Sequence, residues 1–185
     1  MNTLSDIPVI ETARLKLRAH RPEDLDACAE LWADPFVTRH ITGNILTREE
    51  VWSRLLRYAG HWRWLGFGYW VAEEKSSGLF VGELGFADYK REIEPSFDSV
   101  PELGCVLATH AHGKGLATEA LIAVVAWGDE HFQKARTVCL ASPENSGSLR
   151  VAEKCGYREF QRSTYKGKPT VMLERHASNA ISAKL

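Results

Sequence analysis

The stretch His110-Ala-His-Gly-Lys-Gly-Leu-Ala-Thr-Glu-Ala120 decides how the rest of this sequence is interpreted. An apolar segment of strand length, residues 102–108, precedes it, and a longer apolar segment follows it to about Phe132. Two glycines in such a turn let the backbone approach a ligand closely, because no Cβ stands in the way. The following helix offers unpaired N–H groups and the positive end of its dipole. The stretch therefore predicts either a phosphate-binding turn or an ordinary tight turn between a strand and a helix.

Length and composition describe an ordinary globular chain. Its 185 residues, 44% of them hydrophobic and 25% charged, suffice for one domain with its own core. The formal net charge of −1 does not suggest a broad nucleic-acid-binding surface. The start lacks a signal-peptide pattern, and no apolar run approaches a membrane span. We expect one cytoplasmic domain over residues 1–185, with its core at about 14–174 and a flexible tail at 178–185, that binds neither nucleic acid nor membrane.

The four cysteines are scattered along the chain, at Cys28, Cys105, Cys139 and Cys155. None belongs to a C-x-x-C pair, and each lies in an apolar or helical context. Such spacing is typical of reduced core residues in a cytosolic protein.

Hydrophobic periodicity, capping residues and turn residues predict the order of the elements. The predicted strands cover residues 14–18, 69–74, 79–87, 102–108, 136–141, 157–165 and 170–174. The predicted helices cover residues 22–34, 47–65, 116–132 and 145–155. The second of these is expected to begin with the capping box Thr47-Arg-Glu-Glu50 and to have the apolar face Val51, Leu55, Leu56, Ala59 and Trp62. Residues 1–12 are expected to be an extended lead-in, residues 37–44 irregular and residues 88–101 a loop. The resulting order, β-α-α-β-β-β-α-β-α-β-β, predicts an α/β (α+β) fold. In it, a mixed, mostly antiparallel twisted sheet of six to seven strands is flanked on both faces by about four helices.

The glycine turn does not fit the common nucleotide fingerprints. The dinucleotide pattern needs a third glycine and belongs to the first strand–helix unit. Here Gly115 is followed by Leu116-Ala117-Thr118, and the turn lies in the second half of the chain. The P-loop pattern is absent as well. NAD is therefore not an expected ligand.

A second motif follows the long predicted helix, with Asn145-x-x-Ser148 and then Glu153-Lys-x-Gly-Tyr157. Together with it, the segment from His112 to Ala120 resembles the pyrophosphate loop of the GNAT N-acetyltransferases, whose pattern is Gln/Arg-x-x-Gly-x-Gly/Ala. With Glu102-Leu-Gly before them, the two motifs are most similar to the branch of the ribosomal-protein N-terminal acetyltransferases, the RimJ/RimL-like proteins. The resemblance spans about residues 14–174. It implies an acetyl-CoA-dependent enzyme that acetylates a primary amine directly in a ternary complex.

The resemblance implies three cofactor-binding segments. They are the strand residues Cys105, Val106 and Leu107; the turn and helix residues His112, Gly113, Lys114, Gly115, Leu116, Ala117 and Thr118; and the second-motif residues Asn145 and Ser148. A backbone N–H on the strand is expected to stabilise the oxyanion where the strand separates from its neighbour to admit pantetheine. A fixed donor of that kind contributes about 3–4 kcal/mol. Asn145 is expected to hold the pantetheine, and the cations Lys114, Arg150 and Lys154 are candidates for the phosphates.

The chain departs from the family pattern at two positions. His112 stands in place of the usual Gln or Arg, a change that backbone phosphate binding should tolerate. Ala152 stands where many members carry a tyrosine general acid. In the branch that this chain resembles, a serine at the position of Ser148 is the proposed substitute.

Acetyl transfer from a thioester requires a deprotonated amine, and the candidate base is Glu102, directly or through a water. An α-amine has a pKa of about 8 and a lysine amine of about 10.4, so an α-amine needs less help. A positioned base or acid contributes roughly 10²–10⁴-fold in rate. Ser148 is the candidate acid that protonates the departing CoA thiolate. With a thiol pKa of about 8.5, this thiolate is an adequate leaving group even without an acid.

Each assignment has a structural alternative. Glu102 can be a carboxylate at a strand edge, and Ser148 can decorate the first turn of its helix. Asn145 is also a good N-cap residue, and the three cations can be solvated. His110 and His112 are spaced like a metal pair, but no further ligand follows at useful spacing, so no metal is expected.

The acceptor amine is left open by the sequence. A protein N-terminus, a polyamine, an amino acid or an antibiotic amine would each fit. An aromatic segment such as Trp62 to Trp70 more often belongs to the core than to a pocket. Because the resemblance implies that this segment leads to the acceptor side, we expect it, with Arg39, His40 and the 88–101 loop, to form the acceptor wall. The alternative function is a non-catalytic module that binds acyl-CoA as a sensor or scaffold. Either a monomer or a homodimer is compatible with the sequence.

Overall fold

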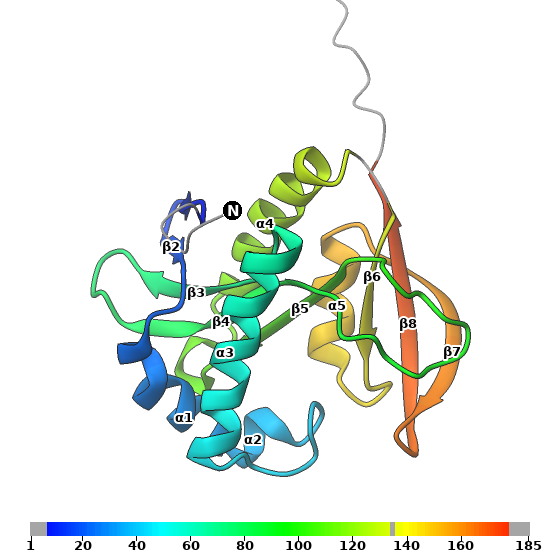
Figure 1. Cartoon of the computed structure of the whole chain (residues 1–185), viewed down its shortest axis with the longest axis horizontal. Helices are drawn as coiled ribbons and strands as arrows, with labels where there is room; N and C mark the ends of the chain where they lie inside the picture. Colours follow the sequence, from blue (N-terminus) through cyan, green and yellow to red (C-terminus); the bar gives the residue numbers. More distant parts are fainter. Residues whose placement is uncertain (1–6, 134–135, 178–185) are drawn as a thin grey trace, which may run out of the picture.

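A computed structural model describes residues 7–133 and 136–177, which fold around one eight-stranded sheet (Figure 1). The strands are β1 (Ile10–Glu11), β2 (Leu15–Arg18), β3 (Tyr69–Glu74), β4 (Phe80–Ala87), β5 (Glu102–Leu107), β6 (Arg136–Ala141), β7 (Arg158–Tyr165) and β8 (Lys168–His176). The helices are α1 (Leu25–Ala33), α2 (Pro35–Thr38), α3 (Arg48–Leu65), α4 (Leu116–His131) and α5 (Ser146–Lys154), with short 3₁₀ turns η2 (Pro22–Asp24) and η3 (Thr109–Ala111).

The sheet is antiparallel except at one junction. Its order is β1-β2-β3-β4-β5-β6-β8-β7, and β5 and β6 are the parallel neighbours. These two strands pair at a single position, Glu102 with Val138, and then diverge along their length. The junction divides the sheet into a β1–β5 part and a β6–β8 part (Figure 1).

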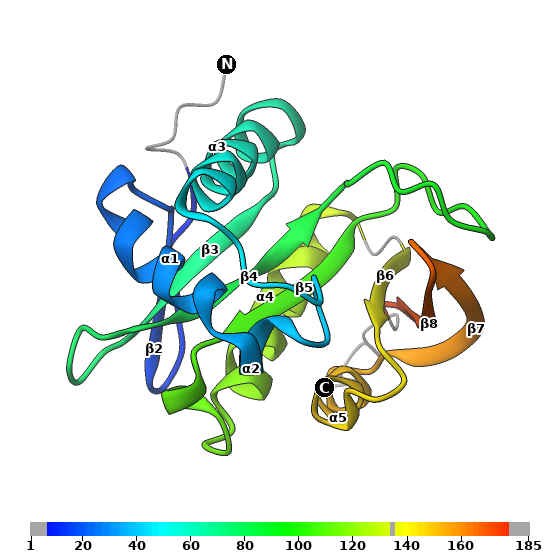
Figure 2. The same ribbon diagram turned by 90° about the horizontal axis from the view of Figure 1, so that it is seen from below.

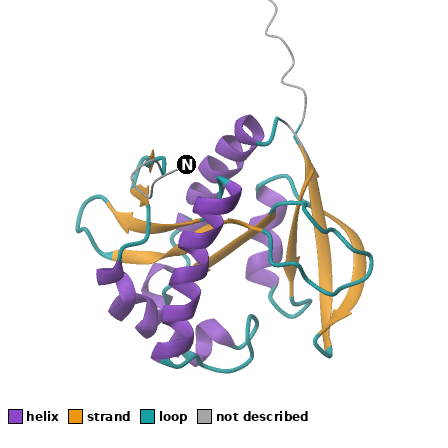
Figure 3. Cartoon of the chain, in the orientation of Figure 1, coloured by secondary structure: helices purple, strands orange, loops and turns teal. Residues whose placement is uncertain are grey.

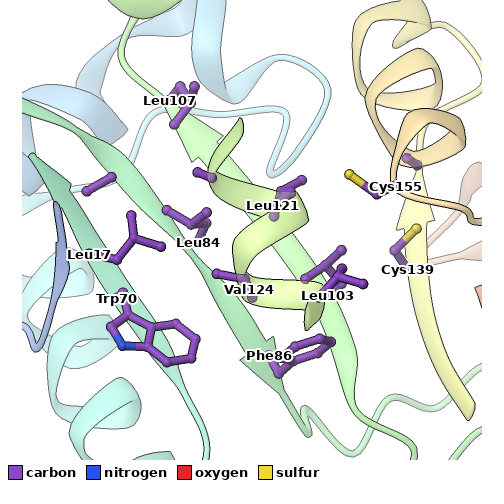
Figure 4. Close-up of a cluster of buried hydrophobic side chains, with 14 of the residues drawn as sticks. Leu17, Trp70, Leu84, Phe86, Leu103, Leu107, Leu121, Val124, Cys139 and Cys155 are labelled. Carbon is purple, nitrogen blue, oxygen red and sulfur yellow. The ribbon is translucent and has the colours of Figure 1, made fainter. Parts of the chain in front are cut away.

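The two faces of the sheet carry different elements. In Figure 2, α3 and the 88–101 loop lie on one side, and α4 and α5 lie on the other. On the α4 side, Leu84 and Leu103 of the sheet pack with Leu121 and Val124 of the helix (Figure 4). Gly128 lets α4 approach β4, because a Cβ there would lie 2.7 Å from the Phe86 ring.

The second core lies beneath α1 and α3. Cys28 and Trp32 of α1, Val51 and Leu55 of α3 and Val106 of β5 are buried together. The predicted capping box starts α3: the Thr47 hydroxyl accepts from the Glu50 amide, and the Glu50 carboxylate accepts from the Thr47 amide.

The fold class is confirmed, and all seven predicted strands are present. Figure 3 shows two additions: β1 forms in the expected lead-in, and α2 forms where irregular chain was expected. Asp34 explains α2, because its carboxylate caps the Phe36 amide while Pro35 begins the helix.

The expected apolar face of α3 needs one correction. Leu56 is 54% exposed, whereas Tyr58 and His61 are buried. The buried face of α3 therefore includes polar residues in place of Leu56. This fits the sheet beneath it, because the facing side of β3–β5 also carries buried polar side chains.

The 88–101 loop is anchored by its own apolar residues. Ile93 and Phe97 are buried against Val138 and Met172 of the second sheet part. The four cysteines are free thiols; three are buried and Cys105 is half-buried. Among the described residues, no helix is long and apolar enough to cross a membrane. The expected tail at 178–185 lies outside the described residues.

Candidate active site

The gap between β5 and β6 exposes backbone groups. The Pro101 carbonyl accepts from the Val138 amide at 3.1 Å, so odd-numbered residues of β5 direct their N–H and C=O groups toward β6. The Val106 carbonyl instead faces Gly82 of β4. Of the three strand residues expected to supply an oxyanion donor, only Cys105 and Leu107 therefore direct an N–H into the gap.

The glycine turn closes the end of this gap. The His112 ring contacts the Leu107 carbonyl through Nε2, at 2.9 Å. Gly113 and Gly115 have φ values of +74° and +76°, the left-handed region that favours glycine. Gly115 is the N-cap of α4, and Leu116 is buried beneath it. The first helical hydrogen bond is donated by Glu119, so the amides of residues 116–118 lack an intrahelical partner.

A polar network that the sequence did not reveal holds the turn against the connection between β1 and β2. The Glu119 carboxylate accepts from the Thr12 hydroxyl at 2.6 Å and from Arg14 Nε at 2.7 Å. Arg14 also donates to the Lys114 carbonyl at 2.9 Å. Burial alone would raise the pKa of Glu119, but these hydrogen bonds outweigh it and lower the pKa. Arg14 thus positions the turn from a site about 100 residues away.

The second motif begins α5 beside the gap. Asn145 is the N-cap, and its Oδ1 accepts from the Ser148 amide at 3.0 Å, so the expected capping role is confirmed. Ser148 is exposed. The side chains of Lys114, Arg150 and Lys154 are also exposed, and none has a carboxylate within 4.0 Å in the described part of the chain. These cations remain available for phosphate groups.

Glu102 lies at the start of the gap and is held by a residue that the sequence did not single out. Both of its oxygens accept from Arg91, at 2.6 and 2.7 Å. Burial alone would lower the pKa of Arg91, but the hydrogen bonds to Glu102 raise it above its ordinary value. A proton acceptor role for Glu102 must therefore use the oxygen lone pairs that Arg91 leaves free.

The same face of the sheet carries a second buried carboxylate, Glu83. It accepts from His20 Nε2 at 2.8 Å and from Trp32 Nε1 at 2.6 Å. Burial opposes its ionisation, but these hydrogen bonds outweigh burial and lower the pKa of Glu83. The side-chain atoms of His20, Cys28 and Glu83 that could bind a metal ion lie within 4.8 Å of one another. The hydrogen bonds satisfy the carboxylate without further ligands.

The expected acceptor wall is only partly correct. Trp62 and Trp70 are buried against Trp127 of α4, so they belong to the core on the other face. Tyr69, between them in sequence, faces α3 and lies directly over β5: a Cβ on Gly104 would lie 1.8 Å from its hydroxyl. Strand alternation places Tyr69 and Trp70 on opposite faces of β3, and Trp62, near the end of α3, joins the same core as Trp70.

The other expected wall residues divide between the two ends of the gap. Arg39 lies 4.0 Å above the Phe36 ring, which is itself 5.9 Å from His112. This segment is therefore near the glycine turn, whereas the 88–101 loop reaches Glu102 through Arg91. His40 is half-buried.

Comparison with known families identifies this arrangement. Residues 14–158 match the acetyltransferase (GNAT) domain. The chain belongs to the GNAT acetyltransferase family. The YkkB protein of Bacillus subtilis is 30% identical over 172 residues, which cover 91% of this chain and 95% of YkkB.

Solved structures of GNAT proteins share the fold over most of their length. A GnaT-family acetyltransferase from Bordetella pertussis superposes with a TM-score of 0.81 and 30% identity, covering 91% of this chain and 99% of that one. RimL, a ribosomal L7/L12 α-N-protein acetyltransferase solved with coenzyme A, has a TM-score of 0.74 and 15% identity, covering 91% of this chain and 98% of RimL. At that identity the likeness to RimL shows the fold alone.

Proposed function

We propose that this GNAT protein transfers an acetyl group from acetyl-CoA to a primary amine. The observation that carries the proposal is the pairing of β5 with β6 at only one ladder position, Glu102 with Val138, with the glycine turn of α4 at the edge of the resulting gap. The gap offers backbone donors to an acyl-pantetheine, and the turn offers amides and a helix dipole to a pyrophosphate.

Acetyl-CoA would bind mainly through backbone groups. The free amides of residues 116–118 face the pyrophosphate, and the exposed side chains of Lys114, Arg150 and Lys154 add positive charge. Pantetheine would then enter the gap, where Asn145 stands at the neighbouring helix end. RimL binds coenzyme A on the same fold, which supports this choice of cofactor.

In the proposed reaction the neutral amine attacks the thioester carbonyl, and a tetrahedral oxyanion forms. The N–H of Cys105 or Leu107 stabilises the oxyanion, since both face the gap. Glu102 accepts the amine proton through a water, because Arg91 already occupies one position on each of its oxygens. The CoA thiolate leaves as the amide forms, and Ser148 donates a hydrogen bond or proton to it.

A second function is favoured by one specific observation. The two-point contact between Arg91 and Glu102 leaves the candidate base engaged, as expected for a structural ion pair. If the pair is only structural, the protein binds acyl-CoA without turnover, as a sensor or scaffold.

A thermal-shift scan with acetyl-CoA, CoA and NAD tests the cofactor assignment first. Acetyl-CoA and CoA should raise the melting temperature and NAD should not, because a ligand that binds only the native state stabilises it. CoA release over an amine panel then tests turnover. Glu102→Gln should reduce the rate at least about tenfold, in the range typical of positioned acid–base groups, while retaining the acetyl-CoA shift.

The same scan separates the alternatives. A shift with both CoA species but no turnover on any amine supports the non-catalytic module. No shift with either CoA species contradicts both functions. The RimJ/RimL-like branch, a protein N-terminus as acceptor, a cytoplasmic location and a monomeric or homodimeric state remain finer predictions.

A further inference from the structure

We propose that the acceptor is a small amino acid or short peptide, and that Arg54, Arg57 and Tyr58 of α3 bind its carboxylate. This inference rests on the proposed acetyl transfer, since it names the class of amine that the same site receives. It is carried by unpartnered donors and unpaired charge on the face of the sheet opposite α4 and α5.

The arrangement of the gap determines where the amine enters. The glycine turn, α4 and α5 lie on one side of the sheet, so CoA and its leaving thiolate occupy that side (Figure 2). The amine must then reach the thioester carbonyl from the α3 side. On that side, Gly104 of β5 immediately precedes Cys105 and has the Tyr69 hydroxyl above it.

An aromatic stack connects this position to α3. The rings of Tyr69 and Tyr58 are parallel within 5°, with centroids 4.6 Å apart. Tyr58 is 1% exposed, yet its hydroxyl has no hydrogen-bond partner within 3.5 Å in the described part of the chain. Burial raises its pKa well above the ordinary value, so the hydroxyl keeps its proton and can donate it. The neighbouring Arg54 side chain lowers this pKa and can only donate to the oxygen, so the O–H of Tyr58 itself has no acceptor among the described residues, although buried hydroxyls are normally satisfied.

Two arginines of α3 surround Tyr58 without a carboxylate of their own. Arg54 lies 3.9 Å above the Trp32 ring, and its buried Nε–H is likewise unpartnered. Arg57 is exposed and lies over the rings of Tyr89 and Tyr58, at 5.1 and 5.9 Å. Across the described ranges, 7–133 and 136–177, neither guanidinium has a carboxylate within 4.0 Å.

The three buried acids of this face are already engaged. Glu102 is paired with Arg91, Asp24 is paired with Arg18, and Glu83 accepts from His20 and Trp32. Among the buried groups around Tyr58 the surplus is therefore positive and consists of donors, which suits the two oxygens of a carboxylate. A polyamine or aminoglycoside would bring further positive charge to these buried donors, and the exposed acids Glu92, Glu94 and Asp98 belong to the 88–101 loop rather than to α3.

The experiment compares amines that differ only in their anionic group. Glycine, β-alanine, γ-aminobutyrate, Gly-Gly and Gly-Gly-Gly are each assayed beside the corresponding amide, with spermine as the polycation. The readout is kcat/KM from CoA release, expressed per unprotonated amine because the amides have different amine pKa values. For at least one pair, kcat/KM for the carboxylate should be tenfold or more higher than kcat/KM for the amide. The chain length of the preferred substrate then measures the distance between its amine and its carboxylate.

Variants test the assigned residues. Arg54→Gln should raise KM for the preferred carboxylate at least tenfold and leave its amide within threefold, and Tyr58→Phe should do the same more weakly. Arg48→Gln, which removes a cation of α3 that pairs with Asp26, should change neither substrate. The acetyl-CoA thermal shift confirms that each variant is folded.

The outcomes distinguish the inference from the function on which it depends. Equal or faster turnover of amides or spermine overturns carboxylate recognition and leaves acetyl transfer standing. The same result follows if Arg54→Gln affects acid and amide alike. An absence of turnover on every amine, with the CoA shift intact, overturns the transferase proposal and this inference together.

Discussion

The two sides of the gap between β5 and β6 present different chemical groups, mainly backbone groups on one side and ionisable side chains on the other. The proposed cofactor side consists mainly of backbone groups that one continuous segment presents, from the Leu107 carbonyl through the turn to the first amides of α4. The proposed acceptor side consists of buried ionisable side chains from β4, β5, α3 and the 88–101 loop. Because of this difference, we expect CoA binding to tolerate most side-chain substitutions. On the acceptor side, we expect the removal of one member of a hydrogen-bonded pair to lower the stability of the fold or the specificity for the amine.

The largest effect is expected on the acceptor side, at Glu83. Glu83→Ala leaves Trp32 Nε1 and His20 without their buried partner, and breaking such a set lowers the free energy of unfolding by about 3–5 kcal/mol. Urea unfolding measures the loss, and calorimetry should show acetyl-CoA affinity unchanged within about twofold under conditions where the variant is folded. A fall in affinity as large as the fall in stability would mean that the two sides are not independent.

The same residue predicts a pH dependence. Because the folded-state pKa of Glu83 is lowered, its ionisation stabilises the fold above the unfolded value of about 4.3. That contribution is lost as the pH falls through the lower, folded-state value. The Glu83→Gln variant cannot ionise at this position. Its free energy of unfolding should therefore fall less than that of the wild type when the pH is lowered from 6 to about 3. Parallel stability curves would contradict this assignment.

On the cofactor side the backbone is the sensitive element. Gly115→Val places a β-branched residue at φ +76°, where strain of about 1–3 kcal/mol should weaken acetyl-CoA binding by about 10–100-fold. Gly78→Val is the matched control, since Gly78 has a φ of +71° in the distant β3–β4 turn. Similar affinities for the two variants would show that the glycine turn does not bind the cofactor.

The smallest effect is expected at Ser148. Ser148→Ala should lower kcat only about 2–10-fold, because a thiolate whose thiol pKa is about 8.5 leaves without much assistance. The KM for acetyl-CoA should stay within about twofold. Ser146→Ala, an exposed serine on the same helix, provides the control in stopped-flow or steady-state assays. A loss near 1,000-fold would make Ser148 an essential acid and sharpen the contrast between the two sides.

The local parts of the site could be predicted because their signals are local. The glycines of the turn, the Thr47–Glu50 capping box and the Asn145 cap depend on residues within four positions, and each appears as expected. The packing of Trp70 toward α4 and of its neighbour Tyr69 toward α3 could not be predicted in the same way. It depends on which face of β3 meets α4, and a mixed aromatic run does not specify that.

The amino-acid sequence by itself determined the order of the seven longer strands and the four longer helices, the glycine turn before α4 and the family resemblance, because these depend on short-range periodicity and spacing. Tertiary structure decided which residues the catalytic candidates meet. Arg14 meets Glu119 from 105 positions away, and Arg91 meets Glu102 only because Ile93 and Phe97 anchor the intervening loop. Such contacts follow from strand register and packing, and no short stretch of sequence contains that information.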